Sequence, residues 1–199
     1  MQLNFDLQEK DDTPEILLNA EKEPSLLQNL PDDCVIVDIE TTGLSPVNDS
    51  IIEISALKIK NGKVEEEFSS LINPKRLIPP FITKLTGIST EMVKDAEETR
   101  TVLKKFCNFI QTNPIVGHNI KFDLRFINKN LDKYFNKTLP NDYTDTLIFS
   151  RKIYTNLSSH KLTKIAEHLK ISTDNAHRAL NDCYMTYRII KDMKERSSQ

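Results

Sequence analysis

The strongest constraint on the fold is the pair Asn61-Gly62, which joins two segments with strand-like patterns. Residues 51–59 and 64–72 alternate between apolar and polar side chains, as strands with one buried face do. An Asn-Gly pair between two such segments predicts a two-residue β-hairpin. Residues 34–39 form another short segment rich in β-branched side chains, which predicts a buried strand. The first three strands should therefore be adjacent and antiparallel.

The rest of the chain alternates between helical and extended patterns. Apolar residues recur at helical spacing in the segments 97–111, 123–135, 146–154, 161–169 and 178–196. A short helix is expected at 81–85 and a short strand at 114–118. Three strands followed by alternating helices and strands predict an α/β fold in which a mixed sheet is flanked by helices.

Length and composition favour a single folded domain. The chain has 199 residues, of which 38% are hydrophobic and 28% charged, as in a globular protein with a sizeable core. We assign residues 1–32 to an N-terminal extension, partly helical or disordered, and residues 33–199 to the main domain. Thr13-Pro14-Glu15 predicts the start of a helix. The apolar side chains expected to pack on the domain or to dock a partner are Ile16, Leu17, Leu18, Ala20, Leu26, Leu27 and Leu30.

Charge and cysteine content exclude some classes of protein. The net charge is -2, so binding to nucleic acid would depend on a local basic groove rather than on a basic chain. Cys34, Cys107 and Cys183 are odd in number and form no C-x-x-C pair, which predicts reduced, packed thiols. The sequence has no signal-peptide pattern and no stretch of membrane-spanning length, so we expect a cytoplasmic protein that does not bind membranes.

The main functional signal begins with two acids in the first predicted strand. Asp38 and Glu40 are two residues apart, so both side chains point to the same face of the strand. Their neighbours are apolar, which places the strand in the core. Two acids on a partly buried face repel each other unless a cation lies between them. A salt bridge to Lys or Arg would also satisfy them, so this pair alone leaves both interpretations open.

Two further motifs add acids and a histidine. Asp123 follows a short predicted strand and opens a helix, where the helix dipole alone would favour an acid. Asp182 lies inside the last predicted helix, where an exposed acid is the ordinary interpretation. His177 precedes it by five residues, a spacing that places the histidine at or before the start of that helix. Four acids and one histidine together suit a pair of divalent metal ions with oxygen ligands.

The combined motifs resemble the DEDD exonuclease family, in its histidine subgroup. They are most similar to the epsilon proofreading subunit, or exonuclease domain, of bacterial DNA polymerase III. The resemblance covers about residues 33–193 and implies a ribonuclease-H-like fold with a five-stranded mixed sheet. The strings that support it, besides the five signature positions, are Glu40-Thr41-Thr42-Gly43-Leu44, His118-Asn119, Asp145-Thr146-Leu147 and Ser159-His160-Lys161-Leu162.

The resemblance also implies roles for the signature residues. The ligands of two divalent metal ions, Mg²⁺ or Mn²⁺, would be Asp38, Glu40, Asp123 and Asp182. Asp38 would bridge both ions, Glu40 and Asp182 would complete the one beside the attacking water, and Asp123 would help hold the second. His177 would take the proton from the attacking water. All five residues would then be catalytic.

A further set of residues would bind the substrate. By resemblance these are Thr41, Thr42, Gly43, Leu44, His118, Asn119 and Phe122. Thr41 and Thr42 would contact the terminal 3′-OH, and Leu44 would lie beside the last base. From the residues alone, Gly43 equally fits a simple turn and Leu44 a rim of the core. Basic residues that would contact phosphates, or would simply be solvated, are Lys121, Arg125, Lys161, Lys164 and Arg178.

The resemblance implies a 3′-to-5′ exonuclease that releases nucleoside monophosphates from single-stranded DNA 3′ ends, in proofreading or repair. An exoribonuclease that trims RNA is one alternative, because discrimination depends on how the site treats the 2′-OH. A catalytically silent module that binds a polymerase is another, although such a module has no physical need for four converging acids. The expected partners are a DNA or RNA 3′ end and, in the polymerase-bound case, a DNA polymerase subunit.

Overall fold

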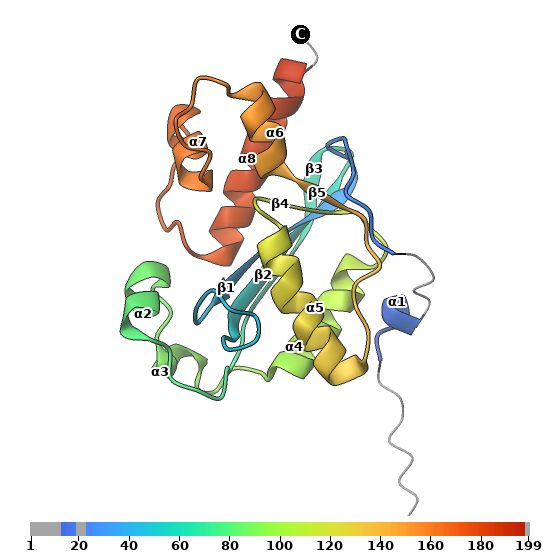
Figure 1. Cartoon of the computed structure of the whole chain (residues 1–199), viewed down its shortest axis with the longest axis vertical. Coiled ribbons are helices and arrows are strands. Elements are labelled where there is room, and N and C mark those ends of the chain that lie inside the picture. The colour runs from blue at the N-terminus through green and yellow to red at the C-terminus, as the bar shows by residue number, and fades with distance from the viewer. Residues whose placement is uncertain (1–12, 19–22, 198–199) are drawn as a thin grey trace, which may run out of the picture.

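The sheet has five strands in the order β3-β2-β1-β4-β5 (Figure 1). The structure, a computed structural model, describes residues 13–18 and 23–197. β1 pairs antiparallel with β2 and parallel with β4, β2 pairs antiparallel with β3, and β4 pairs parallel with β5. The strands are β1 (Cys34–Thr41), β2 (Ile51–Lys60), β3 (Lys63–Leu71), β4 (Ile115–Gly117) and β5 (Tyr143–Asp145). The sheet is mixed, as the sequence predicted.

The β2–β3 hairpin turns at Asn61-Gly62, as expected. Asn61 has φ 50° and Gly62 has φ 68°. Two consecutive residues with positive φ are what the mirror-image turn of a two-residue hairpin requires, and Asn and Gly tolerate this conformation best. The hairpin places β2 and β3 side by side and so fixes one edge of the sheet.

Helices cover both faces of the sheet (Figure 1). One face packs on α4 and α5, through a core that includes Val35, Val37 and Phe126. The other packs on α8 through Ile36, Cys183 and Ile190. The helices are α1 (Glu15–Leu18), α2 (Pro80–Thr86), α3 (Thr90–Val93), α4 (Thr99–Ile110), α5 (Lys121–Phe135), α6 (Thr146–Ile153), α7 (Leu162–His168) and α8 (Ala179–Ser197). Within the described residues, no helix combines the length and apolar character needed to cross a bilayer.

Part of the N-terminal extension belongs to the main core. Leu17 of α1 is fully buried in the same cluster as α4 and α5. Farther on, Leu26 forms a parallel bridge to Tyr143 at the free edge of β5, and Leu27 donates its N–H to the Tyr143 carbonyl at 2.8 Å. This segment therefore packs on its own domain through the Leu17 side chain and the backbone of Leu26 and Leu27, whereas Leu18 is 52% exposed. Ala20, also expected on the apolar face of this helix, lies outside the described residues, and the division at residues 32 and 33 stays a prediction.

The predicted helices and strands are confirmed to within a few residues at their ends, with two omissions. The sequence pattern did not indicate β5, because its three residues, Tyr143-Thr144-Asp145, form no apolar segment. It also did not indicate α3, a four-residue helix whose Met92 N–H is capped by the Ser89 hydroxyl at 3.3 Å. The three cysteines are buried free thiols, as expected.

Candidate active site

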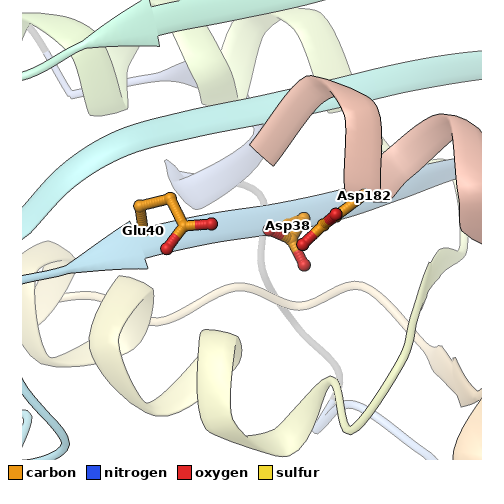
Figure 2. Close-up of side chains that lie close together, drawn as sticks. All are labelled: Asp38, Glu40 and Asp182. Atoms are coloured by element: carbon orange, nitrogen blue, oxygen red, sulfur yellow. The ribbon is translucent and has the colours of Figure 1, made fainter. Parts of the chain in front are cut away.

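Asp38 and Glu40 project from the same face of β1, near its carboxyl end (Figure 2). Val37 precedes Asp38, and Ile39 lies between the two acids. Both point to the opposite face, into the core with α4 and α5. The β1–β2 register shifts between Glu40 and Thr41, immediately beyond the second acid. The two carboxylates therefore share one face of the strand, as their spacing predicted. In the structure this face is turned toward the start of α8 (Figure 2).

Asp182 supplies a third carboxylate from the first turn of α8. One ligand oxygen from each of Asp38, Glu40 and Asp182 can be chosen so that all three lie within 4.8 Å of one another. Figure 2 shows Asp182 reaching down from the helix toward Asp38 on the strand. Asp182 Oδ1 is buried without a hydrogen-bond partner. A buried carboxylate oxygen of this kind, close to two further carboxylates, fits a ligand of a hard divalent cation.

Asp123 lies beside this group but is held differently. It is in the first turn of α5 and is 5% exposed. Its Oδ1 accepts a hydrogen bond of 3.1 Å from the backbone N–H of Ile39, which lies between the two acids of β1. Among the charges that act on Asp38, that of Asp123 is the strongest. The structure thus brings together all four acids that the sequence singled out.

Burial and mutual repulsion make these acids hard to ionise. Burial, reinforced first by Asp123, raises the pKa of Asp38 well above its ordinary value. Burial and the charge of Asp182 raise the pKa of Glu40 to about 8. Burial likewise raises the pKa of Asp123 to about 8 and that of Asp182 to about 7. Four carboxylates with raised pKa values in one place would be stabilised in their charged form by divalent cations.

His177 lies on the loop immediately before α8, where the sequence placed it. Its backbone has φ 64°, in the left-handed region, and its side chain is exposed. A hydrogen bond from the His177 backbone partly offsets the burial that raises the pKa of Asp182. The histidine is therefore tied to one acid through the main chain, and its imidazole is left at the surface of the site.

A fifth buried acid, Glu53, was not singled out from the sequence. It is 2% exposed on β2 and lies directly opposite Glu40 in the antiparallel register. Arg178 donates to it through Nη2 (2.8 Å to Oε1) and Nε (3.1 Å to Oε2). Arg178, which was expected to contact phosphates or to be solvated, is thus paired within the chain, and its contact with phosphate stays a prediction. An acid inside the apolar string Ile51-Ile52-Glu53-Ile54 was the signal that could have found it.

The predicted substrate-binding loop after β1 is internally hydrogen-bonded. Thr41 Oγ1 donates to the Gly43 carbonyl at 2.6 Å, and Thr42 Oγ1 donates to Asp49 Oδ1 at 3.3 Å. A Cβ on Gly43 would lie 2.5 Å from Asp49 Oδ2, so a larger residue there would displace this carboxylate from its hydrogen bonds. Leu44 is 83% exposed. Val47 of the same loop is 77% exposed, so both apolar side chains are free to touch another molecule.

The predicted substrate residues around β4 mostly make contacts within the chain. The His118 ring lies between Thr146 Oγ1, 3.0 Å from Nδ1, and the carbonyl of His160, 2.7 Å from Nε2. The Asn119 N–H donates to Asp145 Oδ1 at 2.9 Å. Phe122 is half-buried and packs on Phe126, with ring centroids 5.0 Å apart. Both ring nitrogens of His118 are already engaged, so it ties β4 to the loop before α7.

The fold and the site together define a class: an α/β domain with a buried carboxylate cluster at the carboxyl end of a central strand. The exonuclease family model (RNase_T) matches residues 35–190. The chain belongs to this exonuclease family and is an enzyme of that class, which confirms the resemblance seen in the sequence.

Relatives and solved structures agree with this assignment. The chain is 42% identical over 176 residues to DNA polymerase III PolC-type of Clostridium perfringens, covering 88% of this chain and 12% of that protein. It is 37% identical over 166 residues to the 3′-5′ exonuclease DinG of Bacillus subtilis, covering 83% and 18%. This chain therefore spans less than a fifth of the length of either relative.

The fold is shared with solved exonucleases. A zinc-bound E. coli ExoI–single-stranded DNA complex superposes with a TM-score of 0.76 at 21% identity, covering 85% of this chain and 42% of that one. Exonuclease X in complex with 5′ overhanging duplex DNA superposes with a TM-score of 0.67 at 24% identity, covering 83% and 93%. These likenesses confirm the predicted ribonuclease-H-like fold.

Proposed function

We propose that this domain is a divalent-metal-dependent 3′-to-5′ exonuclease that releases nucleoside monophosphates from single-stranded DNA 3′ ends. The observation that carries the proposal is the convergence of Asp38, Glu40 and Asp182 to within 4.8 Å, from segments far apart in the sequence. The direction of cleavage follows DinG, which is named a 3′-5′ exonuclease. The choice of DNA follows the polymerase relatives and the solved complexes with DNA.

The four acids would hold two ions, Mg²⁺ or Mn²⁺. Bound there, the ions would act as Lewis acids and stabilise the negative charge that develops on the scissile phosphate. The donor set fits such hard cations, because it consists of carboxylate oxygens, one of which is buried without a partner. Asp38 would be one of the ligands, and its carboxylate interacts with the charges of both Asp123 and Asp182.

The chain's other residues would orient the strand and move the proton. His177, exposed at the rim and fixed next to Asp182, would accept the proton of the attacking water on an imidazole nitrogen. Leu44 would pack against the terminal base, because it is exposed beside the end of β1. A role for residues 41–43 at the 3′-OH stays a prediction. In the setting of a replicative polymerase, this chemistry would remove misincorporated nucleotides.

A side-by-side digestion tests the proposal. Single-stranded DNA and RNA of one sequence, both labelled at the 5′ end, are incubated with Mg²⁺, Mn²⁺ or EDTA, with Asp38→Ala as the matched inactive control. We expect a ladder that shortens DNA from its 3′ end, requires metal and is absent in D38A. Faster shortening of RNA would replace the proposal with the exoribonuclease alternative. Strand binding with no cleavage of either substrate would replace it with the binding-module alternative.

A further inference from the structure

Glu53 joins the middle of the sheet to the start of α8. Its carboxylate uses both oxygens: Oε1 accepts from Arg178 Nη2 at 2.8 Å, and Oε2 accepts from Arg178 Nε at 3.1 Å. Oε2 also accepts from the backbone N–H of Ala179 at 2.9 Å. Two-pronged contacts between a guanidinium and a carboxylate fix direction as well as distance. Glu53 is therefore fully paired, whereas Asp182 has a buried oxygen without a partner.

The hydrogen bond from the Ala179 N–H to Glu53 positions the N-terminal end of α8. The first N–H groups of a helix have no partner within it, and a capping side chain from the preceding residue usually satisfies one of them. Here the acceptor comes from a strand 126 positions away in the sequence. A negative charge at this end is also favoured by the helix dipole. The beginning of α8 is thus positioned by β2.

The positions of His177 and Asp182 both depend on this end of α8. His177 immediately precedes Arg178 and is in the left-handed region at φ 64°. Asp182 donates its N–H to the Arg178 carbonyl at 3.0 Å, which begins the helical hydrogen bonding. Glu53 lies directly opposite Glu40 in the β1–β2 register. The residue of β2 that holds the start of α8 is therefore also fixed relative to the acids of β1. A shift of Arg178 would move His177 and Asp182 together relative to β1.

We propose that Glu53 and Arg178 form a positioning clamp that sets His177 and the start of α8 against the acids of β1. Glu53 is a positioning residue in this reaction and does not touch the substrate. The kinetic part rests on the proposed function, whereas the clamp itself is defined by the hydrogen bonds of the metal-free chain. Removing the negative charge of Glu53 should loosen the His177 loop while β1 keeps its place in the sheet.

The first test observes the histidines of the metal-free protein by NMR. With ¹³C-labelled histidine, His118, His160, His168 and His177 give separate imidazole signals, and His177→Asn assigns the one of interest. In Glu53→Gln we expect the His177 signal to shift or broaden while the signals of the other histidines stay in place. Glu66→Gln is the matched control, because Glu66 is paired with Lys58 at 2.9 Å on the neighbouring strand, away from the site. An unchanged His177 signal in E53Q would overturn the clamp.

A second variant guards against misfolding of E53Q. Arg178→Lys keeps the positive charge but loses the two-pronged contact, and the side chain is 38% exposed, so the change is compatible with folding. It should move the His177 signal in the same way. If E53Q does not fold, the R178K spectrum decides: a shifted His177 signal supports the clamp, and a native spectrum overturns it.

Kinetics separate positioning from simple loss of stability. On a labelled oligonucleotide, well below the melting temperature, E53Q should lower kcat by about 10-fold or more, because misplacement of a catalytic group by about 1 Å is enough for such a loss. KM should change little, and E66Q should match the native enzyme. A native kcat in E53Q with only a lower Tm would overturn the clamp. Absence of native activity would refute the proposed function alone, since the NMR result still decides the clamp.

Discussion

The carboxylate of Asp123 is hydrogen-bonded to the backbone N–H of Ile39, with 3.1 Å between Oδ1 and N. Ile39 lies between Asp38 and Glu40, so the acid from α5 is anchored to the strand segment that carries the other two. One of its oxygens is committed to the main chain, whereas Asp38, Glu40 and Asp182 form the tighter group. The site thus holds its charges in place before any cation is bound, and this arrangement has consequences for stability.

The metal-free protein should lose stability as the pH rises from about 5 to about 8. Burial raises the pKa of Glu40 from 4.5 to about 8 and that of Asp182 from 3.8 to about 7. Between the unfolded and folded pKa values, the folded chain binds more protons than the unfolded chain, so the free energy of unfolding falls as the pH rises. Thermal melts in EDTA should show Tm falling by several degrees, because ~1 kcal/mol corresponds to about 2–4 °C in a domain of this size. A flat or rising Tm would contradict this prediction.

Added Mn²⁺ or Mg²⁺ should reverse that loss. A cation that binds only the folded state stabilises it by about 2.7 kcal/mol at ~100 times its Kd. At about pH 8, Asp38→Asn should melt no lower than the native chain in EDTA, because it removes one of several repelling charges, and its Tm should respond little to metal. Asp132→Asn, an exposed acid on the same helix as Asp123, is the control that should respond normally. A full metal response in D38N would remove Asp38 from the ligand set.

His177→Asn should abolish most cleavage without affecting the fold. Asn tolerates the left-handed backbone at φ 64° almost as well as Gly, so the loop should keep its shape while the imidazole is lost. Loss of a general base lowers the rate by about 10²–10⁴-fold. The rate of 3′-end shortening is measured beside His168→Asn, which removes another exposed histidine. Near-native cleavage in H177N would exclude the imidazole as the base.

Local spacing was enough to predict how the two acids of β1 are arranged, whereas Asp123 and Asp182 were assigned to the site only by combining the motifs with the family resemblance. Two acids two residues apart on a strand must share a face, and the structure confirms that Asp38 and Glu40 do so. The hairpin could be predicted for a similar reason, since Asn61-Gly62 specifies its turn locally. Length alone does not explain why β5 was missed, because β4 also has three residues and was predicted from its apolar side chains. The three residues of β5, Tyr143-Thr144-Asp145, form no apolar segment.

Partners far apart in the sequence were beyond local patterns. The side chain that engages Arg178 is 125 positions away, so no local pattern could indicate that this arginine is paired within the chain. The same holds for His118, whose ring nitrogens face Thr146 and the His160 carbonyl. In each case a polar group close to the site makes a contact within the chain that becomes visible only in the folded arrangement.

The N-terminal segment should contribute to the stability of the main domain through Leu17. This side chain is fully buried with α4 and α5, whereas its neighbour Leu18 is 52% exposed. Leu17→Ala removes buried methyl groups and leaves a cavity, a change that lowers the free energy of unfolding by about 2–5 kcal/mol. Leu18→Ala makes the same substitution in the same short helix and should change it by no more than about 0.5 kcal/mol. Denaturant unfolding of the two variants measures the difference, and equal stabilities would show that α1 is not part of the folded core.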